Sequence, residues 1–254
     1  MKAPVKKLPR KPNSVSRSPR RLPRFSRELA ILYEDDAVIA VDKPAGLLAV
    51  PIPGSDSPSA LSLLSQHLKP RHQSALIVHR IDRFASGVLL FVKTARDRDS
   101  LIKQFLAHTT VREYLAVVRG HLAVKQKVLV HYFRKEGMHQ KLSTERDRTA
   151  TRAELSYSVE RFLLAASLAR VTLLTGLQNQ IRVQFAALGH PVIGDRKYSP
   201  DEATESRISR VALHAAKLQF IHPRTKETVT VECAPPPDFQ SLLKALSPPP
   251  RTSN

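Results

Sequence analysis

The residues best suited to chemistry lie in one polar loop, His79-Arg80-Ile81-Asp82-Arg83. A short apolar segment precedes the loop and the apolar run 88–92 follows it, so both flanks read as strands. A carboxylate held on such supports beside basic residues can act as a nucleophile or as a general base. The ordinary alternative is an Asp that caps a turn. The rest of the sequence decides between the two.

Residues 79–87, HRIDRFASG, resemble the signature of the RluA-type pseudouridine synthases, HR-[LI]-D-x-x-[TS]-S-G. Other stretches resemble further motifs of this family in the same order: VDKPAGL at 41–47, REYLAVV at 112–118, TGLQNQIR at 175–182, GHPVIGD at 189–195 and LHA at 213–215. The resemblance covers roughly residues 30 to 235. Such an ordered series is far more specific than any single motif.

The resemblance implies an isomerase that cuts the bond between uracil N1 and the ribose, turns the base and rejoins it through C5. It implies Asp82 as the catalytic residue, and it requires no metal or cofactor. Arg182 is implied as the cation that keeps Asp82 ionised, since a carboxylate buried alone would take up a proton. Tyr114 would stack on the uracil. Ile181 would line the pocket, although it could equally belong to the core.

Three residues of the loop are expected to meet RNA. In similar enzymes the basic residue at Arg80 enters the RNA stack as the uridine leaves it, and we expect Arg83 and His79 to lie at the same face. Flipping a base costs least in a loop or bulge, so the expected substrate is a uridine in structured rRNA or tRNA. His79 is also interpreted as part of the scaffold, together with the motif residues Lys43, Pro44, Gly46, Gly87, Asp195 and His214.

The chain departs from the family pattern at three positions. Leu177 stands where the family has the Arg of TGR, and Asn179 replaces the usual His before QIR. These changes bear on substrate affinity or identity rather than on the chemistry. Ala85 replaces Thr and so removes a hydroxyl that could cap the loop, at a cost of about 1 kcal/mol.

The composition favours a nucleic-acid partner. Lys and Arg outnumber Asp and Glu by 41 to 22 in 254 residues, giving a formal charge of +19, and a polyanion is the natural partner of such a surface. An anionic membrane is the rival, but no basic amphipathic helix stands out and no apolar run could span a bilayer. The single Cys233 excludes an internal disulfide and a Cys-based zinc site. The ten His residues lack H-E-x-x-H spacing, so no metal is expected.

Both ends of the chain read as disordered tails around a catalytic domain at 28–246. Residues 1–27 are rich in Pro, Ser, Arg and Lys and have few large apolar residues. This arm could contact RNA, act as a solubilising leader or be an organelle transit peptide. A transit peptide should form an amphipathic helix, which the prolines of the arm disfavour. Residues 247–254 form the second tail. No small N-terminal RNA-binding domain is expected, and we expect a cytoplasmic monomer without an obligate protein partner.

The apolar pattern predicts more strands than helices. Strands are expected at 31–33, 38–41, 76–78, 86–93, 113–118, 127–133, 168–174, 211–220 and 228–233. Helices are expected from Pro58 to Pro70, after Thr94, at 178–188 and around 239–246. The strands do not alternate regularly with helices, which predicts an α+β fold with a largely antiparallel or mixed sheet in two joined lobes.

Two other functions fit parts of the pattern. Leu177 and the basic arm would suit a non-catalytic RNA-binding or ribosome-assembly factor that keeps the fold. A metal-dependent nuclease that uses Asp82, Asp195 and nearby His residues is the weaker alternative, and chelators would abolish its activity.

Overall fold

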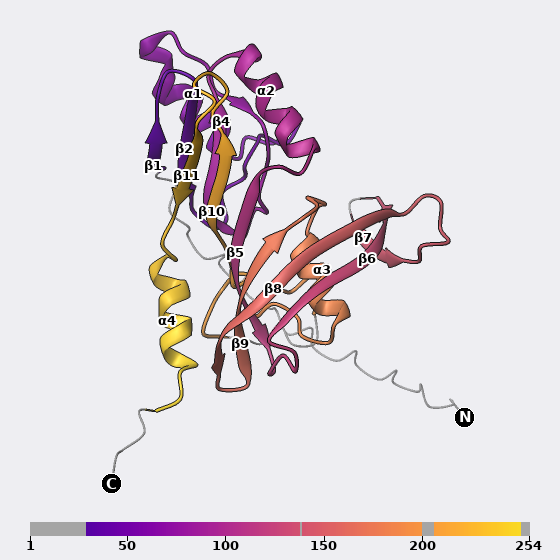
Figure 1. Cartoon of the computed structure of the whole chain (residues 1–254). Coiled ribbons are helices and arrows are strands. Elements are labelled where there is room, and N and C mark those ends of the chain that lie inside the picture. Colours follow the sequence, from indigo (N-terminus) through magenta and orange to yellow (C-terminus); the bar gives the residue numbers. More distant parts are fainter. Residues whose placement is uncertain (1–28, 138, 200–205, 250–254) are drawn as a thin grey trace, which may run out of the picture.

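The computed structural model describes residues 29–137, 139–199 and 206–249. The arm expected at 1–27 and the last residues of the expected tail at 247–254 lie outside these ranges. In the described part, eleven strands form one mixed sheet that is flanked by four α-helices (Figure 1). The α+β class and the two joined lobes predicted from the sequence are confirmed.

The elements follow the predicted order closely. The strands are β1 (Ala30–Glu34), β2 (Val38–Lys43), β3 (Leu76–Ile77), β4 (Ser86–Val92), β5 (Val111–Arg119), β6 (Gln126–Glu136), β7 (His139–Ser143), β8 (Thr151–Leu163), β9 (Ala166–Leu173), β10 (Leu213–Ile221) and β11 (Thr228–Glu232). The helices are α1 (Ala60–Leu68), α2 (Ala95–Leu106), α3 (Gln180–Ala187) and α4 (Pro237–Ala245), with a 3₁₀ turn, η1, at Lys69–Arg71.

The sheet runs through both lobes in the order β1-β2-β4-β10-β5-β9-β8-β6-β7, with β11 beside β10 and β3 beside β4. The first lobe contains β1 to β4 with α1 and α2, and the second contains β6 to β9 with α3 (Figure 1). Strands β10 and β5 join them. Each pair of neighbouring strands in the described part is antiparallel except β4 and β10, which are parallel.

The parallel pair is short, and the two backbones approach closely there. Gly87 has φ +108°, and a Cβ at this position would lie 2.2 Å from the carbonyl oxygen of Ala215. Only glycine adopts this conformation and leaves this space. Next to it, His214 Nε2 lies 2.9 Å from the carbonyl oxygen of Cys233, so Nε2 carries the proton and Nδ1 accepts from Ser86 Oγ. His214 is therefore a buried structural residue, as expected.

Helix starts follow local hydrogen bonding. The prediction that α1 begins at Pro58 is wrong by two residues, because Ser59 forms a capping box with Ser62 and the first helical residue is Ala60. Thr94 caps α2 as predicted, since its hydroxyl accepts a hydrogen bond from the Asp97 amide. Strands β7 and β8 were not expected from the sequence.

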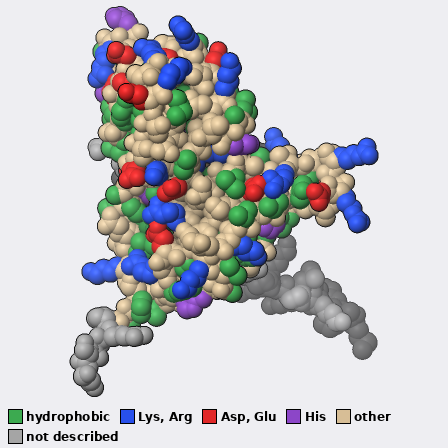
Figure 2. Space-filling model, viewed as in Figure 1, with side chains coloured by type: hydrophobic (Ala, Val, Ile, Leu, Met, Phe, Trp, Pro, Cys, Tyr) green, Lys and Arg blue, Asp and Glu red, His purple; other side chains and the backbone are tan. Residues whose placement is uncertain are grey.

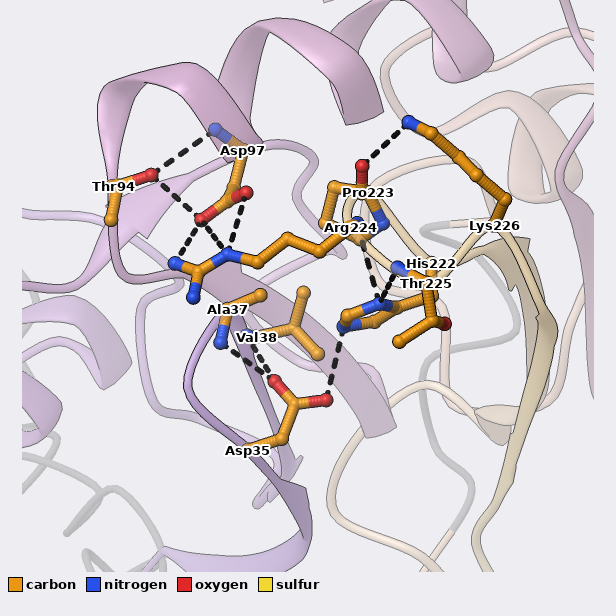
Figure 3. Close-up of polar contacts among 10 residues, drawn as sticks. All are labelled: Asp35, Ala37, Val38, Thr94, Asp97, His222, Pro223, Arg224, Thr225 and Lys226. Atoms are coloured by element: carbon orange, nitrogen blue, oxygen red, sulfur yellow. Dashed lines mark hydrogen bonds and ion pairs between the residues drawn. The ribbon is translucent and has the colours of Figure 1, made fainter.

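A polar cluster holds the turn between β10 and β11 against the first lobe (Figure 3). Arg224 donates from Nη2 to Asp97 Oδ2 at 2.7 Å. His222 Nδ1 accepts hydrogen bonds from the amide of Thr225 at 3.0 Å, so its proton lies on Nε2, 3.0 Å from Asp35 Oδ2. The cluster connects β1, α2 and β10, which are far apart in sequence.

Replacing Asp97 by Asn tests this cluster. The hydrogen bond from Arg224 lowers the pKa of Asp97, so its contribution to stability is present at neutral pH and is lost as the pH falls below the ordinary Asp value of 3.8. We expect Asp97→Asn to lower the Tm by about 2–4 °C at pH 7 and by less near pH 3. Asp99→Asn, at an exposed position of the same helix, is the control for calorimetry. An equal loss in both variants would contradict this role.

Candidate active site

A cavity of about 420 Å³ lies where the two lobes meet. This volume is in the range of small-ligand sites. Its walls come from the loop before β4, from α2, from β5 and from the segment that leads into α3. The lining residues on which the site depends are His79, Arg80, Ile81, Asp82, Phe105, Arg112, Tyr114, Gly176, Leu177, Asn179 and Ile181. The cavity thus collects residues from four distant parts of the chain.

Asp82 lies in the loop that precedes β4. Its neighbour Ile81 is buried in the core and anchors the loop there. The Asp82 carbonyl accepts a hydrogen bond from the Ala85 amide at 3.1 Å, closing a tight turn. The carboxylate is 20% exposed and faces the cavity. The loop geometry therefore presents one acid to a shielded space.

Lys43 fastens this loop to the turn after β2. Its side chain is fully buried, and Nζ lies 2.8–3.1 Å from four backbone carbonyl oxygens, those of Pro44, Leu47, Arg83 and Ala85. Two of these acceptors, Arg83 and Ala85, follow Asp82 by one and three residues in the sequence. Burial lowers the pKa of Lys43 to about 7, against the opposing charge of Asp82. The "DKPAG" segment is thus the support of the Asp82 loop.

Arg182 stands between two carboxylates. Its Nε and Nη2 donate to Asp195 Oδ2 and Oδ1, both at 2.7 Å, and its Nη1 lies 3.4 Å from Asp82 Oδ2. Asp195 is fully buried. Burial alone would lower the pKa of Arg182, but the hydrogen bonds and charges of Asp195 and Asp82 raise it. The fold therefore brings Asp82 and Arg182 together across 100 residues of sequence, with Asp195 as the closer partner.

Asn179 orients Arg182 from the start of α3. It adopts the left-handed conformation, with φ 56°, which Asn tolerates better than most residues. Its Oδ1 accepts from Arg182 Nη1 at 2.7 Å, and its Nδ2 donates to the Tyr198 hydroxyl. The sequence identifies Asn179 only as a departure, and Asp195 as scaffold or as part of the weaker nuclease alternative. No pattern along the chain indicates that both residues contact Arg182, because the contacts depend on the folded loop at 189–198.

Tyr114 and Ile181 lie on opposite elements of the same cavity. Tyr114, on β5, is 8% exposed, and its hydroxyl makes no hydrogen bond to any described residue. Burial raises its pKa to about 12, so the phenol stays protonated at neutral pH. Ile181, on α3, is 3% exposed and belongs to the core as well as to the cavity wall. Both readings of Ile181 therefore apply.

The three residues expected to meet RNA differ in exposure. Arg80 and Arg83 are exposed at the edge of the cavity loop, and Arg83 Nε donates to the Gly46 carbonyl at 3.0 Å. The His79 ring stacks on Phe105 with centroids 4.7 Å apart and accepts the Leu90 amide hydrogen at Nε2. Burial lowers the pKa of His79 to about 3, so the ring is neutral. Contact of these residues with RNA stays a prediction.

The other departures are accommodated by packing. Leu177 is partly buried against the cluster of Phe133, Ala153 and Val183 while it lines the cavity. Ala85 is 1% exposed, and the loop is closed by its backbone groups instead of a side-chain hydroxyl. With Leu177 and Ala85 in place, Asp82 contacts Arg182 and lines the same cavity as Tyr114. Among the described helices, none is long and apolar enough to cross a membrane.

Comparison with known proteins assigns the chain to a class of enzyme. Residues 37–187 match the family described as RNA pseudouridylate synthase. The chain is 33% identical over 230 residues to ribosomal large subunit pseudouridine synthase D of Zymomonas mobilis, covering 86% of this chain and 73% of that one. The same enzyme of Nitrosomonas europaea is 35% identical over 227 residues, and the chain spans 65% of its length.

Two further comparisons agree. The chain is 32% identical over 233 residues to tRNA pseudouridine synthase C of Haemophilus ducreyi, covering 85% of this chain and 95% of that one. The solved structure titled Human RNA Pseudouridylate Synthase Domain Containing 1 superposes with a TM-score of 0.69 at 26% identity, covering 87% of this chain and 89% of that one. The chain belongs to the RNA pseudouridylate synthase family, and is thus an isomerase that acts on uridine in RNA.

Replacing Lys43 by Met tests the support of the loop. The unfolded chain keeps the Lys43 proton up to the ordinary value of 10.5, whereas the folded chain releases it near 7. Between these values the unfolded state binds more protons than the folded state. The free energy of unfolding of the wild type therefore rises with pH relative to that of the variant, by at most about 1.4 kcal/mol per pH unit. Urea unfolding from pH 7 to pH 10 measures this gain.

Lys103→Met, at an exposed position of α2, is the matched control and should show a pH-independent difference from wild type. A flat difference for Lys43→Met as well would show that burial does not perturb this lysine.

Proposed function

We propose that this protein isomerises a specific uridine in structured rRNA or tRNA, with Asp82 as the catalytic residue and without a cofactor. Residues 28–246 would form the catalytic unit, acting as a cytoplasmic monomer with no obligate protein partner. The observation that supports the assignment best is the contact of Asp82 with Arg182, 3.4 Å, inside the cavity that Tyr114 also lines.

The way in which Arg182 is shared supports a reactive carboxylate. Its Nε and Nη2 both donate to Asp195, so Asp82 has only the longer contact with Nη1. A close bidentate pair would occupy both carboxylate oxygens of Asp82. The longer contact still places a positive charge near Asp82. Because only Oδ2 makes this contact, the other carboxylate oxygen of Asp82 remains available to substrate.

The reaction needs little else. The glycosidic bond from N1 to C1′ breaks, the base turns, a bond forms from C5 to C1′, and the C5 hydrogen is replaced by one on N1, so atoms balance without a co-reactant. Asp82 acts either by attacking the substrate or by removing a proton. Tyr114 would hold the base by stacking, while Ile181 limits the depth of the pocket. Arg182 and Asn179 would keep Asp82 aimed at the extruded nucleotide.

The surface suits an extended polyanion. Lys and Arg side chains are spread over both lobes on the face shown in Figure 2, and several lie at the far end of the β6–β7 hairpin. Arg80 and Arg83 stand at the edge of the cavity loop, where they would contact RNA beside the flipped uridine. Relatives named for the ribosomal large subunit and for tRNA support these two substrate classes.

Asp82→Asn tests the assigned chemistry. Asn keeps the shape of the side chain but can neither attack nor take a proton at neutral pH, so we expect pseudouridine formation to fall at least 1000-fold, on the order of the loss seen for a removed catalytic group. RNA binding should be retained. Mapping of pseudouridines in RNA from cells with wild type, variant or no gene provides the measurement and names the target. Full activity of the variant would refute the role of Asp82, and an unchanged map without the gene would favour a non-catalytic RNA-binding factor.

Tyr114 offers a separate test. Tyr114→Phe keeps the ring and removes only a hydroxyl, which forms no hydrogen bond with a described residue, so we expect near wild-type isomerisation. Tyr114→Ala should weaken the reaction by about 5- to 150-fold, because base stacking on an aromatic side chain contributes about 1–3 kcal/mol. Single-turnover kinetics on the mapped RNA measures both. Equal activity of Phe and Ala variants would argue that the ring does not hold the base.

A further inference from the structure

Arg112 is a buried cation without a partner. It lies on β5 two residues before Tyr114 and is 8% exposed. Its Nε and Nη2 are buried and make no hydrogen bond, and no described carboxylate forms an ion pair with it. Its one close aromatic contact is Phe105, whose ring centroid lies 5.9 Å from Cζ. The neighbouring His79 ring offers no negative charge, because histidine is either neutral or positive, and its Nε2 already accepts the Leu90 amide hydrogen.

Such an arrangement is costly for a folded protein. Burial lowers the pKa of Arg112, but an arginine does not lose its proton in the ordinary pH range. A cation–π contact near the distance limit recovers only a small part of the lost hydration. Buried guanidinium groups normally have a carboxylate partner, as Arg182 and Arg210 do in this chain. The exception at Arg112 points to a group that binds there only in a complex.

The surroundings of Arg112 leave room for that group. The side chain lines the same cavity as Asp82 and Tyr114, and residues two apart on a strand point to one face of the sheet. On the facing segment Gly176 approaches so closely that a Cβ there would lie 2.5 Å from Arg112 Nη1. The absent side chain of Gly176 therefore gives the guanidinium its space. Leu177 beside it contributes no competing charge.

We propose that Arg112 binds a phosphodiester group of the RNA strand, adjacent to the uridine held against Tyr114. This inference rests on the proposed function and adds a phosphate subsite to the pocket. Guanidinium groups bind phosphate oxygens through paired hydrogen bonds, and the phosphodiester is the one anionic group that RNA offers. The unsatisfied Nε and Nη2 donors of Arg112 supply such a pair.

Binding of the nucleotide uridine 3′,5′-bisphosphate tests the subsite without turnover. We expect this nucleotide to raise the Tm of the wild-type protein and to bind Arg112→Met about 10- to 100-fold more weakly, the loss typical of a charged hydrogen bond. Because Met removes an unpaired buried charge, the free variant should melt at the wild-type temperature or above. Uridine without phosphates should bind both proteins equally.

Gly176→Ala provides an independent variant that keeps the charge. The added Cβ would displace the flexible end of Arg112, so bisphosphate binding should weaken while uridine binding does not. Arg98→Gln, at an exposed position of α2, is the control for a general loss of positive charge and should bind as wild type. Unchanged bisphosphate affinity in Arg112→Met, or a lower Tm of that free variant, would overturn the proposal.

The outcome is separable from that of the proposed function. Full isomerase activity of Asp82→Asn would remove the assigned chemistry while the bisphosphate result still reports on the subsite. Conversely, loss of the subsite leaves the role of Asp82 intact.

Discussion

The buried ion pair of Arg182 with Asp195 is the interaction on which the site depends. A guanidinium and a carboxylate taken out of water stabilise a protein only when their geometry is close to ideal. Here both nitrogen–oxygen distances are 2.7 Å, and Asp195 also accepts the amides of Lys197 and Tyr198. Because Asp195 holds its Nε and Nη2, Arg182 places a positive charge near Asp82 without forming a bidentate pair with it.

The sheet places this pair because its two lobes meet at a single parallel step. Strand β10 lies between β4 and β5, so the loop before β4, which holds Asp82, comes next to Tyr114 of β5. The step requires the close backbone approach at Gly87, and Lys43 then fixes the loop through backbone carbonyls. The close backbone approach at Gly87, the Lys43 side chain and the burial of Ile81 together determine where the acid points.

Local signals in the sequence predicted most elements but fewer of the contacts. Apolar runs such as 88–92 and the Thr94 cap predicted β4 and α2, because burial and capping act within a few residues. Strand β8 is absent from the predicted elements, although Ala153, Leu155 and Tyr157 alternate with polar residues in the pattern of a half-buried strand. The nearness of Asp82 to Arg182 followed only from resemblance. The parts played by Asp195, Asn179 and Lys43 depend on loops that meet only after folding.

The degree to which each buried charge is satisfied separates two kinds of residue at this site. Lys43 has four carbonyl acceptors and Arg182 has two carboxylates and an amide, so both are complete in the free protein and serve to hold the loop. Arg112 has neither acceptor nor counter-charge in the described structure. Natural proteins retain such locally unfavourable groups chiefly where function requires them. Two buried cations of this site are fully satisfied in the free protein and the third, Arg112, is not. This contrast supports the binding of an anion at Arg112.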